Sequence, residues 1–295
     1  MAYEQTLLKA IIRQRARADR VAAALIRQAR KELKQVAADA VEVARVASEP
    51  VSREQLQREL ASLSVTVKMV RERLSDALGQ ALTQLVETEY DRILHEIERS
   101  LPPEEREEVT RGQADGRQVA EAVLVAGMTY KVALERALRR VQEDVEREVM
   151  DEWGRSFVSS VDEGYRLHES GRSKLLRAAQ AAALVKYVAD RVMTVGTRGV
   201  ADVVLSHVTA TLDVTDRMAW GQNRALFVGM MHVAVLDDKL CSTCAELHGT
   251  VYYFEPQAGE LSVDDMPMVP IHPNCRCIRI GVYERPSPAS EGTMV

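Results

Sequence analysis

The sequence predicts a mainly α fold that ends in a small α+β module, and three observations support this prediction. Apolar residues make up 46% of the 295 positions but aromatic residues only 4%, so Ala, Val and Leu supply most of the bulk. This balance is expected of helices that pack at close range. No proline occurs between Pro103 and Pro256, which permits long uninterrupted helices there. All four cysteines lie between 241 and 277, which sets the C-terminal part of the chain apart.

Residues 1–101 predict a long antiparallel helical hairpin. Apolar side chains recur at alternating spacings of four and three residues, which is typical of coiled-coil packing. They are Ala18, Ala22, Leu25, Ala29, Leu33, Val36, Ala40, Val43 and Ala47 in the first helix, and Leu56, Leu60, Leu63, Val67, Val70, Leu74, Ala77 and Ala81 in the second. Between them, 48–52 predicts a turn, and Ser52 with Gln55 can cap the second helix. At 1.5 Å per residue, the hairpin would extend roughly 70 Å.

The first helix also carries a one-sided positive charge, although the chain as a whole has a net charge of −5. Residues 1–34 contain nine basic and three acidic side chains. At about 100° per residue, six of the basic side chains fall in one narrow arc, nearly opposite the apolar seam. This basic stripe consists of Arg13, Arg17, Arg20, Arg27, Lys31 and Lys34. It could contact phosphates or an acidic protein surface. A solvated outer face is the alternative, because exposed helix faces are usually charged.

Residues 102–229 predict a central helical body. The acidic run Glu104–Glu108 has the charge preferred at a helix start, and we interpret it as a solvated turn. Apolar residues then recur at helical spacing, and further helices are expected near Lys174–Val195 and after Gly199. The Val- and Thr-rich stretch from Val192 to Thr215 leaves a strand open as an alternative.

Residues 230–285 predict a small α+β module, and 286–295, rich in Pro and Ser, predict a flexible tail. Short strands are expected at His232–Leu236, Gly249–Phe254 and Cys277–Tyr283. Units of fewer than about 40 residues usually need a metal or a disulfide for stability. The strands surround two turns that contain the cysteines, so a cross-link between these turns is expected to hold the module together.

Two turns of this module carry metal-binding side chains. The candidates form a Cys-x-x-Cys pair and a His-x-x-Cys-x-Cys cluster: Cys241, Cys244, His272, Cys275 and Cys277. Two such turns brought together form the usual structural zinc site. Because five candidates compete for four places, we expect Cys241, Cys244 and Cys275 to bind, with either His272 or Cys277 as the fourth ligand. His248 is a weaker candidate and is better interpreted as a surface histidine.

Two disulfides or free thiols are the alternatives to zinc. The first ten residues include Glu4, Gln5 and Lys9 and have no long apolar core, so no secretory signal is expected. No stretch approaches the roughly twenty apolar residues that span a bilayer. Chains in a reducing cytosol rarely use disulfides. The sequence therefore favours zinc.

The residues around these turns resemble the C-terminal signature of the phage Mu F-like minor head proteins, also called phage head morphogenesis proteins. The resemblance covers about 230–283 and rests on three strings. These are Asp237-x-x-x-Cys241-x-x-Cys244, Leu247-His-Gly249-Thr-Val and Pro270-Ile-His272-Pro273-Asn274-Cys275-Arg276-Cys277. The segment before them, with Arg217, Trp220, Asn223 and Arg224, fits the family only loosely.

The resemblance implies a structural protein of a tailed phage or phage-like particle, present in several copies and acting in head assembly and in DNA packaging or delivery. It implies a location in the virion, in the head interior or at the portal vertex, after assembly in the host cytoplasm. The partners it implies are the portal and capsid proteins, with packaged DNA as a further candidate.

A zinc-dependent nuclease or other hydrolase, and a cellular zinc-bearing adaptor, are the alternative functions. A His–Asn pair beside Cys-x-x-Cys is typical of HNH-type nucleases, and acidic residues flank the candidate site. These residues are His272 with Asn274, and Asp237, Asp238, Asp264 and Asp265. A catalytic zinc needs an open coordination position, whereas this site has an excess of thiols. No Ser-His-Asp order, phosphate loop or dinucleotide fingerprint occurs. We therefore expect no enzymatic activity.

Overall fold

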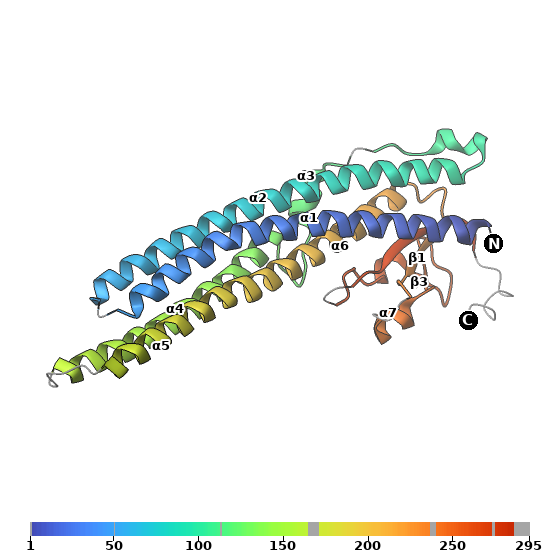
Figure 1. Ribbon diagram of the computed structural model, residues 1–295. Helices are drawn as coiled ribbons and strands as arrows, with labels where there is room; N and C mark the ends of the chain where they lie inside the picture. Colours follow the sequence, from blue (N-terminus) through green and yellow to red (C-terminus); the bar gives the residue numbers. More distant parts are fainter. Residues whose placement is uncertain are drawn as a thin grey trace. The chain divides into compact units, whose positions relative to one another are not determined.

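The computed structural model describes residues 2–49, 51–112, 114–164, 171–236, 240–272 and 275–285. The mainly α fold, with a long helical hairpin, a helical body and a small α+β module, is confirmed (Figure 1). The α-helices are α1 (Ala2–Ala47), α2 (Arg53–Ser100), α3 (Gly116–Ala122), α4 (Tyr130–Gly164), α5 (Gly171–Arg191), α6 (Thr197–Gln222) and α7 (Ser242–Leu247). The strands are β1 (Gly229–Val233), β2 (Val251–Tyr253), β3 (Leu261–Ser262) and β4 (Ile278–Val282). None of the helices in this described part is long and apolar enough to cross a membrane.

The described chain forms two compact units. The first unit comprises Met1–Val21, Gly79–Thr129 and Leu205–Val295, and the second comprises Ala22–Leu78 and Tyr130–Val204. Helices α1, α2 and α6 each contribute to both units, because each is long enough to pack in two different surroundings. The units therefore divide the chain differently from the boundaries at 101, 229 and 285 that the sequence suggested. Residues 286–295, expected to form a flexible tail, lie outside the described residues.

Helices α1 and α2 form the antiparallel hairpin (Figure 1). Every expected seam residue of α1 from Ala18 to Ala47 is buried. On α2 the seam is buried as far as Leu74 except at Leu60, and it then continues at Leu78 and Leu82 in place of Ala77 and Ala81. A straight helix drifts relative to a strict heptad, which brings these larger leucines into the seam. The amide of Gln55 donates to Oγ of Ser52 at 3.2 Å, so this cap is present as predicted.

In the second unit, α4 packs along α5, and Arg191 of α5 contacts Asp144 of α4 with Nη2 and Oδ2 2.6 Å apart. A π-helical turn at Val192–Gly196 joins α5 directly to α6. The separate helices expected before and after Gly199 are thus one continuous helix, and the strand alternative for 192–215 is wrong. Val192, Val200, Val204 and Val208 are buried there, so tertiary packing outweighs the modest preference of valine for strands.

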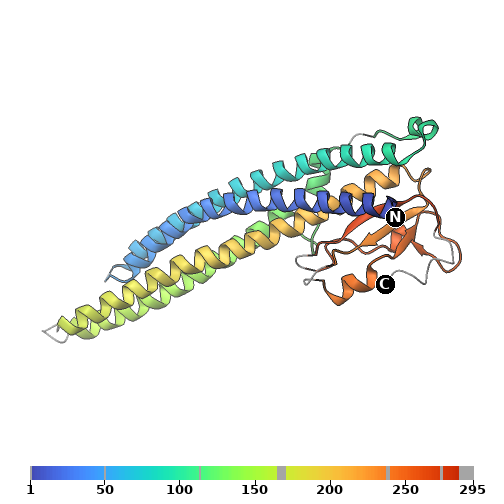
Figure 2. The same ribbon diagram turned by 45° about the vertical axis from the view of Figure 1, so that its right-hand side comes forward.

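In the first unit, the strands of the described chain form one sheet in the order β3-β2-β1-β4. Strand β1 is antiparallel to β2 and β4, whereas β2 is parallel to β3. The ring of Trp220 on α6 lies against Gly281 on β4, where an added Cβ would come within 2.3 Å of the ring. Phe227 packs edge-on against Trp220 at a centroid distance of 4.8 Å. The C-terminal half of α6 is therefore a structural support for the sheet (Figure 2).

The expected strands have shifted boundaries. Strand β1 ends at Val233, three residues before the expected end at Leu236, because the amide of Ala234 donates to the His248 side chain and leaves the ladder. Strands β2 and β4 lie inside the ranges expected for them. The acidic run becomes a short 3₁₀ helix at Pro103–Glu108 with no buried residue, as a solvated turn requires.

Candidate metal site

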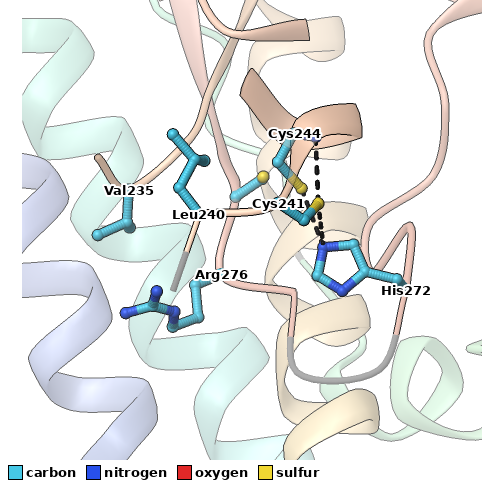
Figure 3. A pocket seen from close by; sticks show the side chains of 7 residues that line it. Val235, Leu240, Cys241, Cys244, His272 and Arg276 are labelled. Carbon is cyan, nitrogen blue, oxygen red and sulfur yellow. Dashed lines mark hydrogen bonds between the residues drawn. The ribbon is translucent and has the colours of Figure 1, made fainter. Parts of the chain in front are cut away.

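The first turn of the site is organised by the short helix α7. Cys241 is the N-terminal cap of this helix, and its Sγ accepts a hydrogen bond from the amide of Cys244 at 3.3 Å. A sulfur at this position takes the role that Ser or Asp oxygen usually plays at a helix start. The same hydrogen bond brings the two sulfurs of the Cys-x-x-Cys pair to the same side of the turn (Figure 3).

The second turn brings an imidazole and two further thiols to the first. Nε2 of His272 lies 3.1 Å from Sγ of Cys241 and 3.1 Å from Sγ of Cys244 (Figure 3). The amide of Cys275 donates to the carbonyl of His272 at 3.0 Å, which closes the turn. This places Sγ of Cys275 3.9 Å from Sγ of Cys244.

Among the described residues, two groups of side chains could hold a metal ion. One consists of Cys241, Cys244 and His272, and the other of Cys244, Cys275 and Cys277, with ligand atoms within 4.8 Å of one another in each group. The structure thus brings together all five residues that the sequence singled out, and Cys244 belongs to both groups. The donor set is sulfur and imidazole nitrogen, which suits zinc and other soft or borderline ions.

The surroundings of the site are compact and partly buried. Cys244, Cys275 and Cys277 are buried, together with Val269 and Ala234. A cavity of about 10 Å³ lies at the site, which is about the volume that one water-sized species occupies. Its walls include Val235, Leu240, Cys241, Cys244, His272, Arg276 and Cys277 (Figure 3). A small ion fits this space, whereas an organic ligand does not.

The thiols differ in acidity because burial and hydrogen bonding act on them unequally. Burial raises the pKa of Cys244 to about 12. A hydrogen bond from the Cys277 thiol lowers the pKa of Cys275 to about 5 and raises that of Cys277. All four cysteines are described and all are free thiols, and the 3.9 Å between Cys244 and Cys275 far exceeds a disulfide bond of about 2.05 Å. Because buried thiols without a counter-ion are costly to ionise, this cluster is suited to a cation.

Other candidates near the site have different roles. His248 is no ligand of this cluster: its Nδ1 accepts a hydrogen bond from the amide of Ala234 at 3.1 Å. Asp264 and Asp265 are exposed at a 3₁₀ turn that Ser262 caps. Asp237, Asp238, Pro273 and Asn274 lie outside the described residues.

The basic stripe is mostly exposed on α1. Arg13, Arg20, Arg27, Lys31 and Lys34 are exposed, as a contact surface or a solvated face would both require. Arg17 is only partly exposed, and its Nε lies 3.7 Å from Oε2 of the buried Glu89. Arg17 therefore takes part in an internal ion pair and is less available to a partner than the other five.

A cluster of charged side chains in the first unit, the unit that contains the metal site, was not predicted from the sequence. Asp213 and Arg217 of α6 and Arg279 of β4 lie together, with Arg279 Nε 3.0 Å from Asp213 Oδ1. Two signals could have found it: an Asp–Arg pair four residues apart on a helix, and a lone arginine inside the apolar strand 277–283.

No family model, no curated protein and no solved structure matches this chain.

Proposed function

We propose that Cys241, Cys244, His272 and Cys275 bind one zinc ion that holds the C-terminal module together. The convergence of the two turns carries this proposal, since His272 lies against the sulfurs of Cys241 and Cys244 at one small cavity and Cys275 lies against the sulfur of Cys244. Two sulfurs bound to one tetrahedral zinc lie about 3.8 Å apart, given a zinc–sulfur distance of about 2.3 Å. The 3.9 Å between Cys244 and Cys275 agrees with that geometry.

Cys277 has a different role in this proposal. Its sulfur lies within 4.8 Å of the sulfurs of Cys244 and Cys275, so its thiol can donate a hydrogen bond to a ligand sulfur. Groups that donate to a ligand atom orient it and tune its charge, and such partners commonly affect metal affinity. We therefore assign Cys277 to the support of the ligand Cys275, with direct binding by Cys277 in place of His272 as the alternative that the variants below test.

A zinc ion bound in this way would be structural. Bound zinc would supply a cross-link between the two turns, with a folding contribution on the order of 10 kcal/mol. Four protein donors leave no coordination position for the water that a hydrolytic zinc must activate. The arrangement therefore favours a non-enzymatic protein over a zinc-dependent nuclease or other hydrolase.

We further propose that the chain is a structural minor head protein of a tailed phage or phage-like particle. Its proposed place is near the portal, where it acts in head assembly and in DNA packaging or delivery. Support comes from the string Pro270–Cys277, which resembles the minor head protein signature. The His and Cys side chains of this string lie close to the cysteines of the Cys-x-x-Cys turn. The exposed residues of the basic stripe offer a surface for acidic portal or capsid surfaces and for DNA.

The direct test is to isolate particles from a strain that carries the gene and to compare them with a deletion strain. The proposal expects the protein in purified particles by mass spectrometry and, by cryo-EM, density assigned to it at the portal vertex. It expects the deletion to reduce the yield of DNA-filled heads. Normal, infectious particles without this protein would contradict the proposal and would favour a cellular zinc-bearing adaptor.

A further inference from the structure

Asp213 is a buried carboxylate on the face of α6 that packs against the sheet, and it contacts both arginines of the charged cluster. Its Oδ2 lies 3.2 Å from Nε of Arg217, and its Oδ1 lies 3.0 Å from Nε of Arg279. The second contact is an ion pair rather than a directed hydrogen bond. Asp213 Oδ2 also accepts a hydrogen bond from the amide of Val269 at 3.1 Å. One carboxylate thus binds two guanidinium groups and one backbone amide.

The two arginines extend these contacts to the backbone that leads into the metal site. Nη2 of Arg217 donates to the carbonyls of Met266 and Pro267, each at 2.9 Å. Arg279 donates to the same carbonyl of Pro267. Together with the Val269 amide, these bonds fix 266–269, the segment that runs directly into Pro270, Ile271 and His272.

Arg279 also fixes the other end of the ligand-bearing segment. It lies on β4, two residues after Cys277, and its side chain is fully buried. Its Nη1 is hydrogen bonded to Nδ1 of His232 on β1. Burial lowers the pKa of His232 to about 3, so this imidazole is neutral and accepts the bond. The chain is therefore held to Asp213 both before His272 and after Cys277.

Such a cluster is stable only while each buried charge keeps its partner. A buried pair that loses one partner leaves an uncompensated buried charge, which is strongly destabilising. Without the Asp213 carboxylate, Arg279 would be buried beside a neutral histidine, and Arg217 would keep only carbonyl partners. The segment 266–269 would lose its anchor, although no metal ligand had been changed.

We propose that Asp213 is a positioning residue for the metal site, so that metal binding and the docking of α6 on the module stabilise each other. This inference rests on the proposed zinc site. Coupling of this kind is reciprocal: if ordered α6 strengthens metal binding, bound metal strengthens the order of α6 by the same free energy.

The test compares Asp213→Asn with Asp216→Asn, a matched substitution three residues away on the same helix. Asp216 is similarly buried, but its carboxylate accepts hydrogen bonds from Gln14 on α1, whereas Asp213 binds the amide of Val269. Cobalt(II) and zinc affinities are measured on the full chain, together with the visible spectrum of bound cobalt. We expect Asp213→Asn to weaken binding by about ten- to a hundredfold and to alter the spectrum. Asp216→Asn should leave both unchanged, and Asp213→Glu should restore part of the affinity.

Hydrogen exchange of the unaltered protein supplies a second measurement in case Asp213→Asn does not fold. Zinc removal should increase exchange at amides of 205–222, which carry no ligand. Equal metal affinity in Asp213→Asn and the parent, or unchanged exchange in this part of α6, would overturn the inference. A separate result would disprove the proposed zinc site, namely a parent protein that binds neither zinc nor cobalt.

Discussion

Nε2 of His272 lies 3.1 Å from Sγ of Cys244, although 28 positions separate the two residues in the sequence. The contact joins a histidine in a proline-rich loop to the first turn of a short helix. Neither turn alone offers a complete set of four ligands, so this contact is where the two halves of the site meet.

Cys244→Ser should abolish zinc binding and unfold the module around 230–285, since Cys244 belongs to both groups of candidate ligands. The loss should be on the order of 10 kcal/mol for the module. Helices of the second unit should keep their exchange protection, because they contribute no ligand. Elemental analysis and hydrogen exchange check this. A variant that retains one zinc per chain and a protected module would contradict it.

The four thiols should not be equivalent. We expect Cys275→Ser to lose zinc, whereas Cys277→Ser should keep one zinc per chain with affinity lowered by about tenfold, since it removes a hydrogen bond to a ligand rather than a ligand. His272→Ala should also lose zinc. Cobalt spectra of these variants report the number of bound thiolates. If Cys277→Ser loses the metal and His272→Ala keeps it, Cys277 is the fourth ligand.

Asp216→Asn should change how stability depends on pH. Burial, and next the charge of Glu89, raise the pKa of the Asp216 carboxyl well above its usual value, while Arg92 and Gln14 act in the opposite direction. A raised pKa means that stability is fully present below the unfolded-state pKa of about 4 and is lost as pH rises through the folded-state pKa. Each unit of elevation corresponds to about 1.4 kcal/mol.

The asparagine variant cannot ionise, so its stability relative to the parent should increase between pH 4 and pH 8. Denaturant unfolding of both proteins across this range measures the difference. A constant difference in unfolding free energy would show that Asp216 ionises normally in the folded protein.

The basic stripe should act as a contact surface without supporting the fold. Changing Arg20, Arg27, Lys31 and Lys34 to Gln should leave helicity and melting almost unchanged, because these side chains are exposed. Incorporation into particles, or DNA binding at low salt, should fall, and the parent's binding should weaken steeply with salt. If the quadruple variant binds and assembles like the parent, the stripe is a solvated face.

Arg17→Gln is the informative comparison for that experiment. Arg17 is a partly buried ion-pair partner of Glu89, which also binds Arg92 at 2.7 Å, so loss of Arg17 should destabilise the first unit by about 1 kcal/mol. Melting temperature should therefore drop for this single change and not for the quadruple variant. An unchanged melting temperature would show that Arg17 contributes no more to stability than the exposed residues of the basic stripe.

Purified protein should show no nuclease or protease activity with magnesium, manganese or zinc, because four protein ligands leave no site for an activated water. Turnover assays on supercoiled DNA and casein check this. Activity that disappears in His272→Ala would favour the hydrolase instead.

The helical periodicity and the cysteine spacing allowed the hairpin and the candidate site to be predicted, because both are local patterns. The α1 seam and the Ser52 cap follow from spacing alone. The continuity of α5 and α6 through Val192–Gly196 could not be predicted, since a stretch rich in valine and threonine fits helix and strand alike.

The sequence marks the Asp213–Arg217 pair and the lone Arg279 separately, but it does not predict that they meet. Asp213 and Arg279 are 66 positions apart, and only the docking of α6 on β4 brings them together. Likewise, spacing identified five donors but could not show that they form two groups that share Cys244.

X-ray absorption at the zinc edge, on protein purified without chelator, tests the central claim most directly. The account predicts one zinc per chain with three sulfurs at about 2.3 Å and one imidazole nitrogen at about 2.0 Å. Absence of metal with all thiols free to react, or a zinc shell that contains a water oxygen, would contradict it.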